Sequence, residues 1–300
     1  MNKSLNHWLG CNVLGHIDKD DASGLVFAAL DNGITRFDTA DIYAAGASES
    51  ELGRLLPYDR SNIKVATKFG HPASVGSGMR PCSPEHITAA VEASLRRLRC
   101  EQIDDYLVHF PDPRTPIAET LETLQVLKSA GKIAAYGVSN FAAADLEALL
   151  ASSASLGLER PQVIQEEYNL LHRGKAELLR PLLLQESLQL MAFFPLASGL
   201  LTGKYLANRT GSVLRSNIVR NFSQRFITPE NMAKVETLAS FCKTKGVPMI
   251  ALALQWLEAQ PIVGAIALGA ANAEQLRENV DAVRNPLPSD MLREADLLFS

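Results

Sequence analysis

Short apolar runs alternate with longer amphipathic segments along almost the whole chain. The apolar runs are bounded by Gly, Asn, Asp or Pro, which is typical of buried strands. The longer segments repeat apolar residues at helical spacing. The predicted strands span 10–15, 34–37, 63–67, 103–108, 133–138, 162–165, 189–193 and 262–268. The predicted helices span 21–31, 48–56, 84–98, 117–130, 142–150, 175–186 and 249–259, and a last one starts at Ala273.

Two local signals predict where helices begin. Ser48, with Glu51 three residues later, is a predicted capping box at the start of the second helix. Ser83 is a predicted N-cap, because it precedes Pro84, and a proline in the first turn lacks only an N–H that has no helical partner there.

The alternation predicts an α/β fold, a (β/α)8 TIM barrel with one domain over residues 1–300. Near-continuous apolar strands are buried on both faces, as in closed parallel barrels. A doubly wound open sheet is the alternative, but it normally shows Gly-x-Gly-x-x-Gly after its first strand, which Gly15–Lys19 does not match. One long loop, 205–229, follows the seventh strand and is expected to overhang the active face.

The composition of the chain indicates how large its core can be, which partners it has and where in the cell it is located. Hydrophobic residues make up 47% of the chain and charged residues 21%, which is enough for a large core. The net charge is −4 and the basic residues are scattered, so we expect neither nucleic acid nor a membrane as partner. The four cysteines form no Cys-x-x-Cys pair, which is typical of a reducing compartment. With no signal-peptide pattern and no long apolar run, the predicted location is cytoplasmic.

Polar and aromatic side chains follow almost every predicted strand. Because the carboxyl ends of parallel strands share one face of a barrel, these residues are candidates for a single site. Taken singly, each has a simpler interpretation, since a strand-end Asp is usually a turn and a strand-end Lys is usually solvated. Their coincidence favours a site. The candidates are Asp38, Tyr43, Lys68, His109, Ser139, Asn140, Gln165, Tyr168, Phe193, Phe194 and the segment Gly269–Asn272.

Four of these residues form a set that suits proton transfer to a carbonyl oxygen. A phenol such as Tyr43 has a pKa near ~10, and an adjacent ammonium such as Lys68 is expected to lower it towards neutrality. The Asp38 carboxylate would keep that ammonium charged, and His109 would hydrogen-bond and orient a carbonyl. The set is therefore predicted to protonate a developing alkoxide.

The electrons for such a reduction are expected to come from an organic hydride donor, because the sequence shows neither a metal-ligand cluster nor a nucleophile elbow. Ser139, Asn140 and Gln165 are suited to hold a carboxamide, and Phe193 is suited to stack on a nicotinamide ring.

The chain resembles the aldo-keto reductase family over nearly its whole length. Each matching motif is modest alone, but their order is highly specific. The motifs are Phe37–Tyr43, Ala66–Lys68, Leu107–Pro113, Gly131–Lys132, Gly137–Phe141, Gln165–Asn169, Pro195–Leu196, Gly199–Lys204 and Glu274–Asn279. The resemblance implies an eight-stranded barrel that binds a nicotinamide cofactor without a Rossmann domain.

The resemblance also implies a role for each matching residue. Tyr43 would be the general acid, Lys68 and Asp38 would tune its pKa, and His109 would orient the carbonyl. The implied cofactor-binding residues are Ser139, Asn140, Gln165, Phe193, Pro195, Leu196, Gly199, Leu201, Lys204, Gly269, Gln275, Glu278 and Asn279, the last two at the adenine.

The chain departs from the family pattern in three places. Phe193–Phe194 stands where many members have Tyr-Ser, so stacking is kept but a hydroxyl for phosphate is lost. Residues 265–276 include no Arg or Lys for the 2′-phosphate of NADPH, and each charge-assisted bond is worth roughly 1.5–3 kcal/mol. NADP(H) is therefore only slightly favoured, with NAD(H) a close alternative. The candidate substitute ligands for the 2′-phosphate lie in the long loop, and they are Arg209, Arg215, Arg220 and Arg225.

The first strand also lacks the usual aromatic after its glycine, so the near wall of the substrate pocket is expected to be atypical.

The predicted function is hydride transfer between a nicotinamide cofactor and a small aldehyde or ketone, or the matching alcohol. One alternative is a cofactor-binding regulatory subunit on the same barrel, resembling potassium-channel β-subunits. Another, a sugar isomerase or aldolase barrel, would need a metal cluster or a Schiff-base lysine, for which Lys68 is the candidate. Tyr106 and Tyr168 are predicted core residues. His71 is predicted to lie on the surface, with the mouth of the pocket as the alternative. Neither the substrate nor the oligomeric state follows from the sequence.

Overall fold

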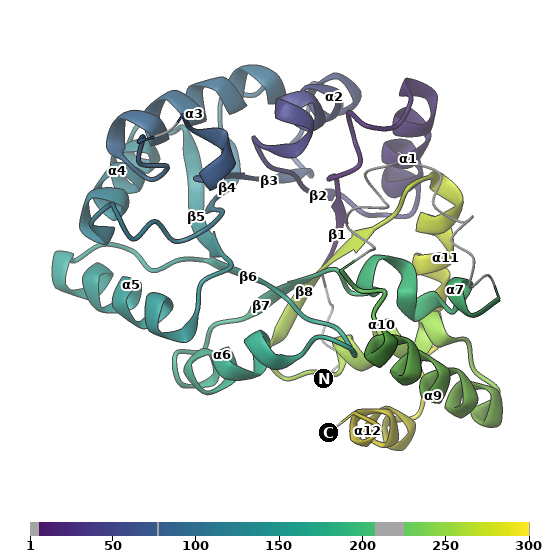
Figure 1. Ribbon diagram of the computed structural model, residues 1–300. Helices are drawn as coiled ribbons and strands as arrows, with labels where there is room; N and C mark the ends of the chain where they lie inside the picture. Colours follow the sequence, from purple (N-terminus) through teal and green to yellow (C-terminus); the bar gives the residue numbers. More distant parts are fainter. Residues whose placement is uncertain (1–5, 77, 208–224, 300) are drawn as a thin grey trace.

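Eight parallel strands close into a barrel in the computed structural model, which describes residues 6–76, 78–207 and 225–299 (Figure 1). Each strand pairs with the next one in chain order, and β8 pairs with β1. The predicted (β/α)8 barrel is confirmed, and the open sheet is excluded. The strands are β1 (Asn6–Gly10), β2 (Arg36–Asp38), β3 (Lys64–Phe69), β4 (Ile103–Val108), β5 (Ile133–Ser139), β6 (Val163–Glu167), β7 (Leu190–Phe193) and β8 (Val263–Gly269).

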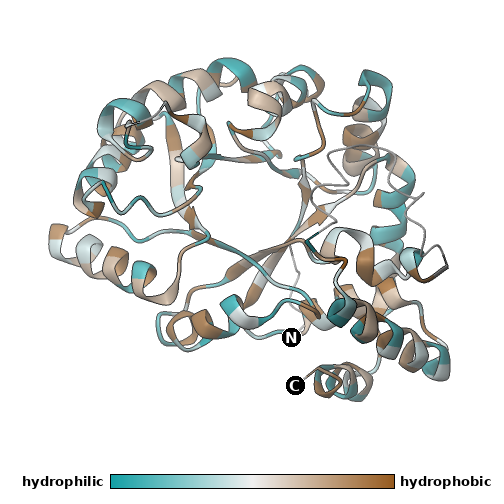
Figure 2. Cartoon of the chain, in the orientation of Figure 1, coloured by the Kyte–Doolittle hydropathy of each residue, from teal (hydrophilic) through white to brown (hydrophobic). Residues whose placement is uncertain are grey.

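Helices form an outer layer around the strands, and each shows both hydrophilic and hydrophobic residues, as expected for a ring that covers a core (Figures 1 and 2). In the part of the chain that the structure describes, no helix is long and apolar enough to cross a lipid bilayer. The α-helices are α1 (Lys19–Asp31), α2 (Ala47–Leu55), α3 (Pro84–Leu98), α4 (Ile117–Ser129), α5 (Ala143–Leu156), α6 (Gly174–Gln185), α7 (Lys204–Ala207), α9 (Pro229–Lys245), α10 (Met249–Glu258), α11 (Ala273–Arg284) and α12 (Ser289–Leu297). Short 3₁₀ helices are η1 (Tyr43–Gly46), η2 (Pro72–Ser74) and η3 (Ala197–Thr202).

The alternation of side chains along the strands decides which residues face the barrel interior. On β3, Val65 and Phe69 belong to the large core beneath the helices, whereas Ala66 belongs to a separate small cluster inside the barrel. Because side chains alternate with a period of two, Lys68 faces the interior as Ala66 does. Asp38 pairs with Ala66 in the parallel register and therefore shares that face. The register thus brings an acid and a base together inside the barrel.

The first strand lies earlier than the sequence predicts. The prediction was 10–15, but β1 covers Asn6–Gly10 and pairs with β8 along its whole length. The polar residues Asn6 and His7 obscured the strand, because they interrupt the apolar pattern. Gly15 has a left-handed backbone (φ 84°), so this part of the prediction is a turn and not a strand.

One of the two predicted helix starts is correct. Ser83 caps α3, with its hydroxyl oxygen accepting a hydrogen bond from a backbone N–H of the first turn. The capping box at Ser48 and Glu51 is wrong, because α2 begins one residue earlier, after a glycine. The Ser48 hydroxyl instead donates to the Cys11 carbonyl oxygen (2.7 Å) and bonds the Thr39 hydroxyl (2.8 Å). A tertiary contact therefore replaces the local one.

The long segment after β7 is described only at its two ends. Residues 208–224 of the predicted loop lie outside the described residues. The candidate phosphate ligands among them are Arg209, Arg215 and Arg220. Arg225 pairs with Glu167 at the end of β6 (2.9 Å), and its guanidinium lies over the rings of Phe194 (4.7 Å) and Phe226 (4.5 Å). Arg225 is therefore engaged by protein groups.

The helix α9 was not predicted from the sequence. Thr228 caps α9 by accepting from the Asn231 N–H (3.1 Å), and Pro229 occupies the first turn, which is the same start signal as in α3. The helix is rich in charge and has few buried apolar side chains, so its hydrophobic pattern is weak. The Thr–Pro pair was the signal that could have found it.

Candidate functional site

A buried ion pair joins the ends of β2 and β3. The Lys68 ammonium donates to both carboxylate oxygens of Asp38 at 2.9 Å and to the Thr39 carbonyl oxygen at 2.8 Å. Asp38 is 4% exposed and Lys68 is 1% exposed. Burial alone would lower the pKa of Lys68, but Asp38 and Tyr43 raise it above its ordinary value. The ammonium therefore stays charged, with all its N–H donors engaged.

Tyr43 lies on η1, directly after β2, with its ring partly buried. The Lys68 Nζ atom is 5.1 Å from the centroid of that ring, and the His109 ring lies edge-on at 6.0 Å. The prediction that Lys68 brings the phenol towards neutrality is wrong. Burial raises the pKa of Tyr43, and the Lys68 charge only partly opposes this effect. The phenol is therefore protonated at neutral pH and suited to donate a proton.

His109 follows β4 and is 7% exposed. Burial lowers its pKa to about 2, and the Lys68 charge acts in the same direction. The imidazole is therefore neutral. Its Nδ1 atom is buried and has no hydrogen-bond partner among the described residues. A neutral imidazole keeps one N–H donor, which suits it to bind an oxygen atom rather than to supply a proton.

His71 and Phe110 lie beside this imidazole. Both ring centroids are 5.2 Å from that of His109, with Phe110 stacked at 19° and His71 tilted at 70°. His71 is partly exposed, and its ring contacts place it beside His109, near the predicted pocket mouth. Its Nδ1 accepts from the Ala73 N–H at 3.0 Å. Only the position of His71 shortly after Lys68 hinted at this contact.

A chain of hydrogen bonds follows the ends of β5 and β6. Asn140 Nδ2 donates to Ser139 Oγ at 3.1 Å and to the His109 carbonyl oxygen at 3.0 Å. Ser139 Oγ donates to Gln165 Oε1 at 3.3 Å, and Gln165 Nε2 donates to Asp38 Oδ1 at 2.9 Å. The structure thus brings together the three residues predicted to hold a carboxamide. It also joins them to the ion pair, a link that sequence reasoning missed.

The predicted cofactor-binding segment after β7 contains both partly buried aromatic side chains and fully buried residues. The ring centroids of Phe193 and Phe194 lie 5.5 Å apart, and both side chains are partly buried. Pro195, Leu196 and Leu201 are buried, and the two leucines pack in the large hydrophobic core. Of the four residues here that were predicted to bind the cofactor, only Phe193 keeps an accessible side chain.

The turn at Ala197–Gly199 lies against a lysine. All three residues have left-handed backbone, and the Ala197 and Gly199 N–H groups donate to the Phe194 and Leu196 carbonyl oxygens, both at 2.9 Å. A Cβ atom on Gly199 would lie 2.3 Å from Lys204 Nζ. The exposed Lys204 ammonium therefore lies directly against the turn, and its charge suits a phosphate group.

The predicted cofactor residues after β8 shape a turn. Gln275 Oε1 accepts from the Ala271 N–H at 3.0 Å, and Asn279 Nδ2 donates to the Gly269 carbonyl oxygen at 3.1 Å. Glu278 is exposed on the same helix. Gly269 is exposed too, and a Cβ atom there would contact nothing. This end of β8 is therefore open.

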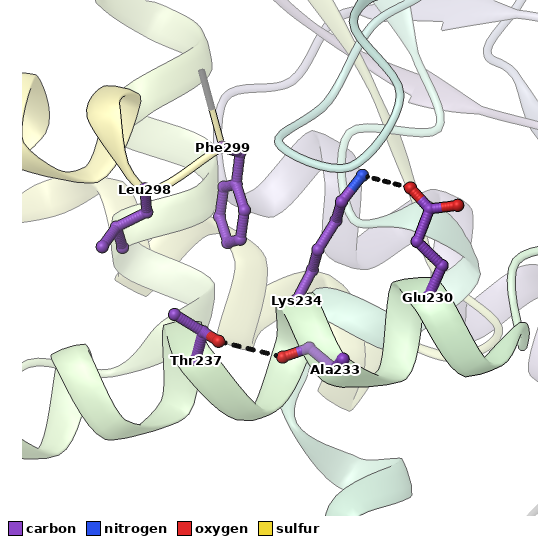
Figure 3. Close-up of a pocket in the computed structure, with 6 residues that line it drawn as sticks. All are labelled: Glu230, Ala233, Lys234, Thr237, Leu298 and Phe299. Atoms are coloured by element: carbon purple, nitrogen blue, oxygen red, sulfur yellow. Dashed lines mark hydrogen bonds and ion pairs between the residues drawn. The ribbon is translucent and has the colours of Figure 1, made fainter.

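A hollow elsewhere on the molecule lies between α9 and the residues that follow α12 (Figure 3). Lys234 pairs there with Glu230 at 2.8 Å, and Phe299 forms the opposite side. None of its lining residues comes from the carboxyl end of a strand, so this hollow is separate from the candidate site.

The chain is a (β/α)8 barrel with polar side chains at the carboxyl ends of its strands, the end at which enzymes of this fold have their active sites. Sequence comparison supplies the family. The profile of the Aldo/keto reductase family matches residues 6–298, and the chain belongs to that family, as the resemblance implied. This is a family of oxidoreductases that act on small carbonyl compounds and generally use NAD(P)H.

Relatives of this chain carry different names. It is 33% identical to Aldo-keto reductase YhdN of Bacillus subtilis, over 91% of this chain and 82% of that protein. It is 32% identical to L-glyceraldehyde 3-phosphate reductase of Escherichia coli K12, over 94% and 84% of the two chains. It is also 32% identical to a probable voltage-gated potassium channel subunit beta of Arabidopsis thaliana, over 89% and 83%.

Proposed function

We propose that this protein reduces a small aldehyde or ketone, or oxidises the matching alcohol, with NAD(P)(H) as hydride donor and Tyr43 as general acid. The observation that carries the proposal is the buried Asp38–Lys68 pair beside a protonated phenol, with Lys68 Nζ 5.1 Å from the Tyr43 ring. Its test is a Tyr43→Phe variant, whose expected behaviour is given in the Discussion.

Each side chain has a distinct part in the proposed proton transfer. The Tyr43 hydroxyl donates its proton to the carbonyl oxygen as negative charge develops there. Lys68 stabilises the phenolate that is left, and Asp38 keeps Lys68 charged. The neutral His109 imidazole donates a hydrogen bond to the same oxygen and orients it. The Tyr43 hydroxyl, the His109 N–H and the Lys68 charge are fixed near the position where negative charge develops on the oxygen. They therefore stabilise the transition state more than the ground state.

The residues present fit a nicotinamide dinucleotide. Ser139, Asn140 and Gln165 lie together at the ends of β5 and β6, where they would hold the carboxamide. The Lys204 ammonium, which lies against the left-handed turn at Gly199, would hold a phosphate. When bound, the reduced cofactor supplies the hydride. The protein's own part is to hold the ring near the Tyr43 hydroxyl.

A Gly199→Ala variant is expected to bind the cofactor about tenfold more weakly. The new Cβ would lie 2.3 Å from Lys204 Nζ, at a φ of 86° that alanine disfavours, so both the turn and the ammonium have to shift. The measurement is a titration of cofactor by quenching of protein fluorescence. Gly157→Ala is the matched control, because Gly157 is also left-handed (φ 64°) but faces open space at the end of α5. Equal affinities in the two variants would remove the turn from the cofactor site.

We propose that this protein slightly prefers NADP(H) over NAD(H) as its cofactor. The proposal rests on the usual cofactor preference of the family. The span 265–276 contains no Arg or Lys, so the 2′-phosphate gains little there. The same titration with both cofactors is expected to give affinities within about tenfold of one another, a difference of about 1.4 kcal/mol. A preference of a thousandfold for NADP(H) would reveal a dedicated phosphate site elsewhere.

The second candidate function is that of a cofactor-binding regulatory subunit. Two relatives, from Arabidopsis thaliana and from Oryza sativa, are named as probable voltage-gated potassium channel beta subunits, each 32% identical to this chain. Loss of bound reduced cofactor on addition of carbonyl compounds distinguishes the two functions. If no member of a broad carbonyl panel oxidises the cofactor, the regulatory function is the better proposal.

A Schiff-base mechanism at Lys68 is disfavoured by the contacts of its ammonium. Its ammonium hydrogen-bonds Asp38, Thr39 and Tyr43, and its pKa is raised, so the free amine is scarce. Borohydride is therefore expected to trap no substrate on Lys68, and a trapped adduct would favour an aldolase instead.

A further inference from the structure

Three successive residues after Tyr43 have left-handed backbone. They are Ala44 (φ 50°), Ala45 (φ 53°) and Gly46 (φ 86°). This conformation is unfavourable for alanine, because its Cβ approaches a carbonyl oxygen. Such a turn persists only where its surroundings hold it. Because the turn directly follows Tyr43, whatever holds it also sets the position of the phenol.

Two groups enclose this turn. On one side is Gly15 of the β1–α1 connection, where a Cβ atom would lie 2.7 Å from Ala47 Cβ and 3.0 Å from Ala44 Cβ. On the other side, the Arg97 side chain from α3 lies against Gly46, where a Cβ atom would lie 2.7 Å from Arg97 Nε. The turn therefore rests directly on an arginine side chain.

Glu49 holds that arginine in place. Arg97 Nε donates to Glu49 Oε2 at 2.6 Å, and Thr67 Oγ1 donates to Glu49 Oε1 at 2.7 Å. Glu49 is 0% exposed. Thr67 immediately precedes Lys68 on β3 and faces the opposite side of the strand. One buried carboxylate thus connects the arginine behind the turn to the strand that carries Lys68.

We infer that Glu49 and Arg97 are positioning residues for Tyr43, because together they hold the left-handed turn that directly follows it. The inference rests on the proposed function for the role of Tyr43 as the acid, but not for the contacts that hold the turn.

The first test is kinetic. Glu49→Gln and Arg97→Ala are each expected to lower kcat by about 10- to 100-fold, the effect of a misplaced catalytic group. KM and the cofactor Kd should stay within about twofold, because neither side chain contacts the site, and Arg97→Lys should recover part of the loss. The control is Glu51→Gln, which breaks an ion pair with Arg54 (2.8 Å) on the same helix. An unchanged kcat in Glu49→Gln, or a matching loss of cofactor affinity, overturns the inference.

The deciding test needs no turnover, so it separates this inference from the proposed function. Amide hydrogen exchange is followed for residues 43–47 in the full-length protein. Exchange there is expected to be at least about tenfold faster in Glu49→Gln and Arg97→Ala than in the wild type and in Glu51→Gln, with exchange in α6 unchanged. Equal exchange of the turn in all four proteins overturns the inference, whether or not the wild type reduces a carbonyl.

Discussion

A Tyr43→Phe variant is expected to lose about 10²–10⁴-fold in kcat while its cofactor Kd stays within about twofold. The substitution removes only the hydroxyl that donates the proton. The ring keeps its position beside Lys68 and His109, so binding of the cofactor and the carbonyl changes little. Initial rates with a reactive aldehyde, together with a fluorescence titration of the cofactor, measure both quantities.

Tyr58→Phe is the control for this prediction, because Tyr58 is fully exposed (104%) in the connection from α2 to β3, which precedes the strand and does not follow its carboxyl end. It should leave both kcat and the cofactor Kd unchanged. A Tyr43→Phe variant with near-normal kcat would assign the proton to another group.

A Lys68→Met variant is expected to show the largest loss of stability, about 3–5 kcal/mol in the free energy of unfolding. Lys68 is 1% exposed and makes its contacts with Asp38 at 2.9 Å, so its removal leaves a buried carboxylate without a cation. Turnover should fall together with stability, because nothing then stabilises the phenolate. Urea unfolding measures the loss.

Two further variants check the origin of that loss. Lys64→Met alters an exposed lysine of the same strand and should change stability by no more than about 0.5 kcal/mol. Asp38→Asn combined with Lys68→Met should be more stable than Lys68→Met alone, because the uncompensated charge is gone. If the double variant is less stable than the single one, the loss has a cause other than the lone carboxylate.

The pH dependence of stability has a definite sign. Since the pKa of Lys68 is raised on folding, its contribution is fully present below the ordinary lysine pKa of about 10 and is lost as the pH rises beyond it. In Lys68→Met, the lone buried Asp38 carboxyl has a raised pKa instead. The deficit of this variant should therefore be smallest in acid and grow as the pH rises towards neutrality.

Most of the fold follows from the sequence because most strands and helices carry their own local signal. The apolar runs that became β3, β4, β5, β7 and β8 are long enough to identify, and Ser83 marks the start of α3. The first strand was misplaced, because its polar start at Asn6 is stabilised by pairing with β8, which is a long-range contact. α9 was missed because charge outweighs its few buried apolar residues.

The sequence predicts which residues gather at the candidate site, but it does not predict their burial, their pKa values or the backbone conformation around them. Parallel strands share one carboxyl face, so Asp38, Lys68 and His109 were expected together, and the structure brings them together. The raised pKa of Tyr43 depends on burial, which no local pattern encodes. The left-handed turn at Ala44 was equally hidden, because alanine has no preference for that conformation and only the surrounding contacts impose it.

The bond between Gln165 and Asp38 (2.9 Å) is a further example, since 127 residues separate the two along the chain. A strand-end glutamine was expected to face a carboxamide. Gln165 also supports the ion pair, because its side chain reaches across the barrel to Asp38. The spacing of residues along the chain does not predict that contact.

The central claim is that this barrel passes a hydride to a carbonyl carbon while Tyr43 protonates the oxygen. The most direct test is a stopped-flow record of bound reduced nicotinamide, at a single turnover, after mixing with a panel of aldehydes and ketones. We expect carbonyl-dependent loss of the reduced-cofactor signal in the wild type, and about 10²–10⁴-fold slower loss in Tyr43→Phe. A stable signal in the wild type with every carbonyl, despite confirmed cofactor binding, would contradict the claim.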